Sequence, residues 1–233
     1  MVRVFLPRSF DHGLTVVVAT MLLALTVVLG AILLATGRNA PFQNIDDAWN
    51  GFGSALHSPF WDVVNLILNW TGYTGMVIFH GLLALGLLIR RRPTMAIFSI
   101  VSGLTVMLLT QLLKWLIHRP RPGDAHVATE TYSYPSGHVS ATTAFLLAVA
   151  FLLGRGWAWL LAIGGMVSMM ASRVYLAAHW FTDVVGGACL ASGVVLMLWL
   201  VFQNICIQEN MDARRLLDWR SGASRRRRHA GQR

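Results

Sequence analysis

The chain has 233 residues, of which 55% are hydrophobic and only 12% are charged. A soluble domain carries roughly twice that share of charged residues, so the composition indicates a single integral membrane domain. The net charge of +9 does not indicate a nucleic-acid partner, because no recognition motif accompanies it. The densest arginine run, at 225–228, lies in a polar tail, where anionic lipid headgroups are the better partner.

An uncharged apolar run at 13–37 opens the chain and is long enough to cross a bilayer core of about 30 Å. A cleaved signal peptide is the competing interpretation, but its apolar region would be only about 7–15 residues long, so we expect a retained first helix. The polar stretch 38–62 contains aspartates and tryptophans. It favours a short interfacial helix capped near Asn44, with the tryptophans at headgroup depth.

Further apolar segments follow, and the predicted fold class is an all-α polytopic membrane bundle of about six transmembrane helices. The paired prolines after Arg119 should end the third helix near His118. The fourth span is short for a crossing, so we expect its start below the membrane surface. The predicted membrane domain covers 1–210, with a basic tail at 211–233 and spans at about 14–36, 63–89, 94–114, 138–153, 157–173 and 181–207.

Six crossings place both termini on one side of the membrane. The positive-inside rule assigns that side to the cytoplasm, because it then holds the arginines at 3, 8, 90–92 and 155 and those of the tail. The tail is expected to be disordered and non-catalytic. The polar stretches around 114–138 and 173–183 then gather at the extracytoplasmic face of the cell (inner) membrane, where we expect the active site.

The stretch 172–183 places an arginine, a histidine and an aspartate in an otherwise apolar region. His179 and Asp183 are four residues apart, so on a helix they lie on the same face. The carboxylate can then orient one imidazole nitrogen and leave the other free as a nucleophile or base. A lone histidine on an apolar helix is more often structural. The paired carboxylate and the upstream Arg173, whose planar guanidinium suits a phosphate, favour a functional site instead.

Lys114 and Arg121 form a second cluster, seven residues apart. An unbroken helix would point both side chains the same way, but Pro120 interrupts it, so we expect Arg121 to reach back from the loop. The alternative is a pair of cations that snorkel to the membrane interface.

The third cluster is the sequence Pro135-Ser136-Gly137-His138 at the start of the fourth span. Ser136 suits an N-cap, and the free amides and positive dipole end of the helix suit an anion. His138 in the first turn is a candidate proton donor to a leaving oxygen. Taken alone, this sequence is equally typical of an ordinary helix start.

The three clusters together resemble a known signature. Lys114-x6-Arg121-Pro122, Pro135-Ser136-Gly137-His138 and Ser172-Arg173-x5-His179-x3-Asp183 are similar, in order and internal spacing, to the motifs of the type 2 phosphatidic acid phosphatase family. That family is the membrane lipid phosphatase branch of a superfamily shared with the vanadium haloperoxidases. Its bacterial members include undecaprenyl-diphosphate and phosphatidylglycerophosphate phosphatases, and no motif position departs from the pattern.

The resemblance implies roles for the matched positions. His179 would attack phosphorus to form a phosphohistidine, Asp183 would orient its imidazole, and His138 would protonate the leaving group and then activate water. The residues implied to bind the phosphoryl oxygens are Lys114, Arg121, Ser136, Gly137 and Arg173. No cofactor is implied, and these stretches contain no acidic cluster suited to a metal such as magnesium.

Several alternatives stay open. The substrate could be undecaprenyl diphosphate, phosphatidylglycerophosphate, phosphatidate or a lipid A phosphate, with the lipid tail left in the bilayer. A phosphohistidine could also pass its phosphoryl group to a sugar or lipid hydroxyl, which would make the protein a phosphotransferase. From another class, a transporter or lipid-binding protein would need the cations but not a nucleophile. A haloperoxidase is disfavoured because those relatives are soluble. The motifs leave the oligomeric state open.

The remaining polar residues receive no catalytic role. His118 and Arg119 border the first motif, and contact with headgroups is preferred over a position at the site entrance. No function is predicted for His80 or His126, and Asp124 and Glu130 are expected to be solvated loop charges. On one helix Cys189 and Cys206 would be about 25 Å apart, too far for a disulfide.

Overall fold

The structure is a computed structural model that describes residues 5–37, 40–123, 125–127 and 132–230. This described part is helical and contains no strand, which confirms the all-α fold class. Asp124 and Glu130 lie outside it. The elements are α1 (His12–Thr36), α2 (Gln43–Ala55), α3 (Pro59–Trp70), the π-helical turn η2 (Thr71–Gly75), α4 (Met76–Ile89), α5 (Pro93–Ile117), α6 (Gly137–Leu153), α7 (Gly156–Tyr175) and α8 (Phe181–Ala230).

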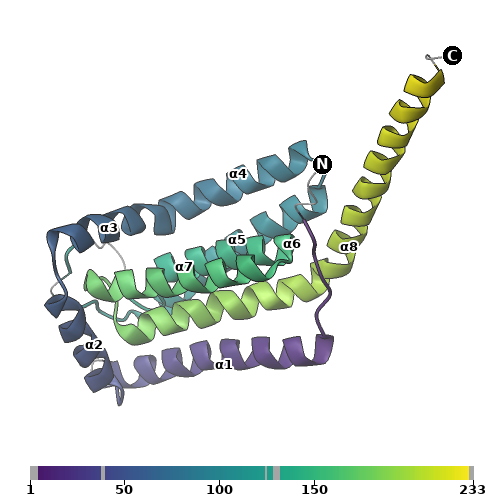
Figure 1. Cartoon of the computed structure of the whole chain (residues 1–233). Helices are drawn as coiled ribbons and strands as arrows, with labels where there is room; N and C mark the ends of the chain where they lie inside the picture. Colours follow the sequence, from purple (N-terminus) through teal and green to yellow (C-terminus); the bar gives the residue numbers. More distant parts are fainter. Residues whose placement is uncertain (1–4, 38–39, 124, 128–131, 231–233) are drawn as a thin grey trace.

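The chain is an integral membrane protein by the length and composition of its helices. Five segments of the described chain are long and apolar enough to cross a membrane: His12–Thr36, Pro59–Ile89, Pro93–Ile117, Gly156–Tyr175 and Phe181–Ala213. α6 has 17 residues, so it is about 26 Å long, shorter than a bilayer core of about 30 Å. It packs against α5, α7 and α8 (Figure 1), so protein rather than lipid surrounds much of this short helix.

Three boundaries differ from the sequence predictions. The second span begins at Pro59, after Ser58, whose hydroxyl accepts a hydrogen bond from the Trp61 amide and caps α3. α2 starts at Gln43 without a side-chain cap, so the predicted cap near Asn44 is wrong; Asn44 already lies within the helix. α8 continues to Ala230 instead of giving way to a disordered tail, because the basic segment is rich in residues that favour helix and contains no proline.

Helix contacts along the bundle are close and largely apolar. α1 runs beside α8 (Figure 1), and the Thr26 hydroxyl lies 3.3 Å from the Gly186 carbonyl oxygen. This packing supports the retained first helix. In the core, the ring of Phe151 stacks on Trp199, and Phe98 meets the same indole edge-on. Cys189 and Cys206 are buried and free, in agreement with the prediction that they do not pair.

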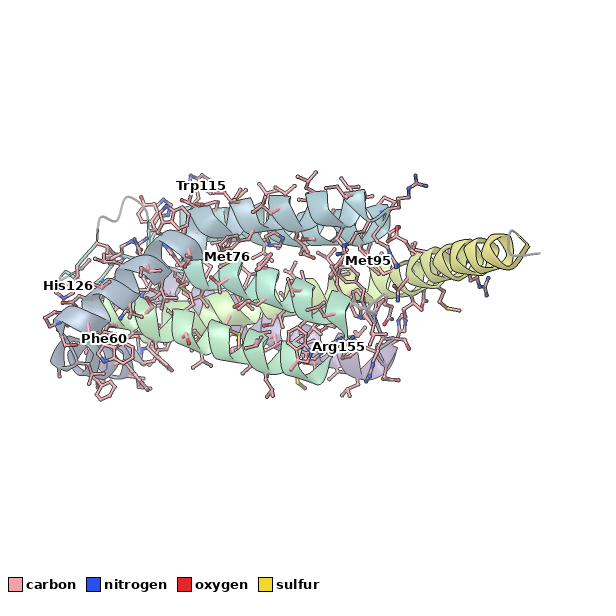
Figure 2. All side chains as sticks on the ribbon, turned by 45° about the horizontal axis from the view of Figure 1, so that its top comes forward. Phe60, Met76, Met95, Trp115, His126 and Arg155 are labelled. Carbon is pink, nitrogen blue, oxygen red and sulfur yellow. The ribbon has the colours of Figure 1, made fainter. Side chains whose placement is uncertain are left out.

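The two ends of the bundle differ in content. α2 and the start of α3 lie at one end, together with the end of α7 and the start of α8, while both chain termini lie toward the other (Figure 1). Figure 2 places Phe60 and His126 at the first end, here called the α2 end, and Met95 and Arg155 at the opposite end. The loops that carry the three motifs therefore meet at the α2 end.

Candidate active site

The candidate nucleophile lies in the loop between the fifth and sixth predicted spans, so the same-face helix geometry considered for His179 and Asp183 does not apply. The chain leaves α7 through Ala177, whose φ is 46°, and α8 begins only at Phe181. His179 therefore precedes the helix, while Asp183 lies in its first turn. The two are still neighbours, with 3.5 Å between His179 Nδ1 and Asp183 Oδ2, and both are buried.

The partners of His179 define its protonation state. A guanidinium nitrogen of Arg121 lies 3.2 Å from Nε2. Because a guanidinium can only donate, Nε2 must accept, and the ring proton belongs on Nδ1, toward Asp183. Burial lowers the pKa of His179 well below its ordinary value, and the positive charges of Lys114, Arg121 and Arg173 lower it further. The imidazole is therefore neutral near pH 7, with a lone pair on Nε2.

Asp183 is held from several directions. One carboxylate oxygen accepts the Trp180 amide at 3.0 Å, which caps the start of α8, and the other accepts a guanidinium N–H of Arg119 at 2.6 Å. Its backbone carbonyl accepts the Ser136 amide at 3.0 Å, so the second and third motifs are joined directly. This carboxylate thus has little freedom to turn away from His179.

Arg119 is an interior residue, which corrects the preferred interpretation that it faces headgroups. It is 4% exposed and makes a second ion pair, at 2.6 Å, with Asp46 on α2. Asp46 is fully buried and also accepts the amide and hydroxyl of Thr182 at 2.8 Å each. Sequence reasoning missed both residues. One signal for this pair was available in the sequence. The predicted interfacial helix carries an aspartate, and the three motifs carry several cations that need a partner.

The second motif forms the N-terminus of α6, with Ser136 at the N-cap as predicted. Its hydroxyl makes no side-chain cap; the oxygen is buried and has no hydrogen-bond partner among the described residues. Tyr134 anchors the preceding loop by donating to the Thr26 carbonyl at 2.6 Å. Gly187 of α8 permits the close approach, since a Cβ there would lie 2.7 Å from the Ser136 carbonyl oxygen.

The first motif contributes two cations from opposite sides of a turn. Lys114 is buried in the last turn of α5 and donates to the carbonyls of Tyr132 and Ser133. α5 ends at His118, which has a left-handed conformation, as the prolines predict. Arg121 then reaches back from the loop, as expected, and donates to the Ala178 carbonyl beside His179.

Arg173 occupies the last turn of α7 and is fully buried. Its terminal nitrogens donate to the side chain of Asn69 at 2.6 Å and to Ser172 at 3.0 Å. Its Nε is buried and lacks a partner in the described chain. Buried polar groups are normally satisfied, so this donor and the Ser136 hydroxyl are positioned for an oxyanion that a ligand would bring.

His138 lies in the first turn of α6, and its Nε2 is 3.0 Å from the Asn69 backbone carbonyl. All predicted site residues, from Lys114 to Asp183, thus lie on the facing ends of α5, α6, α7 and α8 and on the loops between them. Within the described residues, no three His, Cys, Asp or Glu side chains are grouped so as to hold a metal ion.

Two pockets flank this site. The larger, of about 600 Å³, is lined mostly by apolar side chains of α2, α3, α7 and α8 and reaches Ser172 and Phe181 beside the third motif. The smaller, of about 110 Å³, lies among α4, α5 and α6 and reaches Gly137. The site therefore adjoins apolar space on two sides.

Comparisons with known proteins find several similar sequences. Undecaprenyl-diphosphatase from Sulfolobus acidocaldarius is 31% identical over 134 residues, which cover 54% of this chain and 61% of the relative. Phosphatidylglycerophosphatase B from Bacillus subtilis is 26% identical over 181 residues, covering 73% and 88%. Decaprenylphosphoryl-5-phosphoribose phosphatase from Mycobacterium tuberculosis is 33% identical over 88 residues, covering 36% and 48%.

The fold also has a solved counterpart. The crystal structure of a transmembrane PAP2-type phosphatidylglycerolphosphate phosphatase from Bacillus subtilis superposes with a TM-score of 0.69, at 24% identity, over 77% of this chain and 93% of that one. The PAP2 superfamily pattern itself matches residues 94–206, the stretch that carries all three motifs. This part of the chain is therefore similar to the PAP2 superfamily.

Proposed function

We propose that this protein is a lipid phosphatase that cleaves a phosphomonoester or diphosphate through a phosphohistidine on His179. One observation carries the proposal. The buried neutral imidazole has Nε2 turned to Arg121 and Nδ1 turned to Asp183. The ring thus carries on Nε2 the lone pair that a nitrogen nucleophile needs, and a bound phosphoryl oxygen would accept the Arg121 N–H in its place. Lys114 and Arg173 supply further positive charge nearby.

In the first step, Nε2 of His179 forms a bond to phosphorus as the bond from phosphorus to the leaving oxygen breaks. The leaving oxygen takes a proton from His138 in its protonated form. Asp183 stabilises the positive charge that develops on the His179 ring. The surrounding cations and the α6 amides stabilise the negative charge on the phosphoryl oxygens, which is the main requirement of phosphoryl transfer.

In the second step, a water molecule gives a proton to the now neutral His138 and attacks the phosphohistidine. The bond from phosphorus to Nε2 breaks, inorganic phosphate leaves, and both histidines return to their starting states. No step of this cycle requires a metal ion, so we expect activity in the presence of a chelator.

The larger pocket supports a lipid substrate. Its walls include Trp49, Phe52 and Leu68, and its inner part reaches Ser172 next to Arg173. A hydrocarbon chain can occupy such a pocket while the phosphate meets the charged site, so the headgroup need not leave the membrane surface. The names of the relatives favour isoprenoid diphosphates and phosphatidylglycerophosphate as first candidates.

We further propose that the α2 end faces the extracytoplasmic side of the cell membrane, with both termini in the cytoplasm. The support is the positive-inside rule, because the arginines at 90–92, Arg155 and the basic end of α8 belong to the opposite end of the bundle. In sealed right-side-out vesicles, phosphate should then be released into the outer medium.

The deciding measurement is phosphate release by purified protein in detergent with EDTA present. Undecaprenyl diphosphate, phosphatidylglycerophosphate and phosphatidate are offered to the wild type and to His179→Ala. We expect release by the wild type and a loss of at least about 10³-fold in the variant, since the nucleophile is gone. The ranking of wild-type rates then gives the substrate class.

Two outcomes would favour the alternatives. If a lipid or sugar hydroxyl captures the phosphoryl group more readily than water does, the protein is a phosphotransferase. If a His179→Gln variant and the wild type bind the lipid equally and neither turns it over, the protein is an anion-binding transporter or lipid-binding protein. Either result would overturn the phosphatase proposal.

A further inference from the structure

A residue outside the three motifs contacts two of the candidate catalytic groups at once. Asn69, at the end of α3, accepts an N–H of Arg173 at 2.6 Å with its side-chain oxygen. Its backbone carbonyl oxygen lies 3.0 Å from Nε2 of His138. One residue thus joins the candidate phosphate-binding arginine to the candidate acid–base histidine, which are 35 positions apart in the sequence.

The helix is irregular where it makes these contacts. The regular helix α3 ends at Trp70, and the π-helical turn η2 begins at Thr71, two residues after Asn69. Single π-turns of this kind are frequent at functional sites. Here the Asn69 carbonyl lies beside a histidine of the second motif.

The same turn encloses the His138 ring on a second side. A Cβ on Gly72 would lie 3.1 Å from His138 Cδ2 and 2.6 Å from Met169 Cε, so the His138 ring lies close to the backbone of the turn. The Tyr73 ring lies against the imidazole, with 5.7 Å between ring centroids, and its hydroxyl is held by Gln111 at 3.0 Å. The turn therefore restricts both the position and the tilt of the histidine.

The carbonyl contact also identifies the nitrogen of His138 that can act. A carbonyl oxygen only accepts, so Nε2 must carry a proton and donate it to Asn69. Nδ1 is then the nitrogen left to exchange a proton with the leaving group and with water. A fixed tautomer of this kind is the usual role of a backbone carbonyl behind an acid–base histidine.

We propose that three residues, Asn69, Gly72 and Tyr73, position the groups that carry out the reaction. The Asn69 side chain orients Arg173, and the Asn69 carbonyl, Gly72 and Tyr73 hold His138 with Nδ1 toward the substrate. The inference rests on the proposed phosphatase function, since it assigns supports to two groups that act in it.

Two variants test the two parts of the proposal, the orientation of Arg173 and the position of His138. In Asn69→Ala, Arg173 loses its acceptor, and we expect phosphate binding and kcat/KM to fall about 10- to 100-fold for every substrate. In Gly72→Ala, the new methyl crowds the His138 ring and the end of the Met169 side chain, and we expect a loss of rate that depends on the leaving group. It should be large for a lipid phosphate and small for p-nitrophenyl phosphate, whose leaving group needs little help from an acid.

Matched controls lie on the same helical segment. Thr71→Ala removes a hydroxyl that bonds, within the described residues, to the α3 carbonyls of Ile67 and Leu68. Gly81→Ala adds a methyl into open space on α4. Both should keep wild-type kinetics. If Asn69→Ala and Gly72→Ala keep wild-type kinetics while folded, or if Gly72→Ala slows both substrates equally, the positioning role is wrong.

The design separates this inference from the function on which it rests. If the wild type releases phosphate and His179→Ala does not, the proposed phosphatase function stands, whatever the result for Asn69→Ala. If the wild type releases no phosphate, the proposed function fails. Calorimetric measurement of inorganic phosphate binding still tests whether Asn69 orients Arg173. Weaker binding by Asn69→Ala than by Thr71→Ala supports this part of the proposal, and equal binding overturns it.

Discussion

Two buried arginines, one at each end of the bundle, show how similar groups serve different purposes. At the opposite end, Arg92 donates to Asn210 at 2.7 Å and to the Glu209 carbonyl, and the Glu209 carboxylate caps the first amides of α5. At the α2 end, Arg119 joins Asp183 to Asp46, beside buried groups that have no hydrogen-bond partner among the described residues.

The difference separates a helix junction from the candidate active site. Around Arg92 the charged and polar groups form hydrogen bonds with helix ends and with each other. Around Arg119 the paired charges surround an excess of cations, since Lys114, Arg121 and Arg173 also converge on His179. Unsatisfied buried donors cost stability, so their presence beside extra positive charge indicates a place for an anion.

Among the tests of this comparison, replacement of Arg119 should have the largest effect on stability and turnover. In Arg119→Ala, two buried carboxylates lose their partner, and we expect the free energy of unfolding to fall by about 3–5 kcal/mol. Because Asp183 is no longer fixed, kcat should fall about 100-fold in the protein that remains folded. Thermal unfolding in detergent and phosphate release measure the two effects.

Arg92→Ala is the matched control, since it removes a buried arginine at the opposite end. It should cost about 1–3 kcal/mol of stability, through the lost hydrogen bonds, and leave the turnover of folded protein unchanged. If both variants lose turnover in proportion to stability alone, Arg119 has no role beyond structure.

Removal of the Ser136 hydroxyl should separate binding from stability. Because this oxygen has no partner in the described protein, Ser136→Ala should leave the unfolding temperature unchanged or raise it slightly, while KM rises about tenfold. Ser140→Ala, one turn along α6, removes a hydroxyl bonded to the Ser136 and Gly187 carbonyls. It should show the reverse pattern, with lower stability and unchanged KM. Equal effects of the two variants on KM would contradict the assignment.

The smallest expected effect is a shift in pH dependence. Burial and nearby cations lower the pKa of His179, so the ring stays neutral and active at pH values below its ordinary pKa. Arg121→Gln removes one repelling charge and should raise this pKa. The acidic limb of kcat/KM then moves to higher pH by up to about one unit, in addition to any overall loss of rate. The control Arg90→Gln makes the same change in net charge at the other end of the bundle and should leave the acidic limb of kcat/KM in place. If the acidic limb does not move in Arg121→Gln, Arg121 does not act on the pKa of His179.

The sequence alone determined the fold class and the members of the three motifs. Long apolar segments require helices in a bilayer, and cations, a helix start and a histidine with its carboxylate specify phosphate chemistry at fixed spacings. These features are local, so they are visible without the fold. The charge distribution also predicted that the motif loops share one end of the bundle, and the structure brings them together there.

Only the tertiary structure decided which residues support those motifs. Arg119 meets Asp46 from 73 residues away, and Arg173 meets Asn69 from 104 residues away. The turn after α7 also decided that His179 lies in a loop beside Arg121, where helix spacing does not describe its relation to Asp183. A buried charge must find a partner, but which helix brings that partner depends on how all the helices pack. The π-turn at Thr71 likewise arises within an apolar segment whose composition predicts only an ordinary helix.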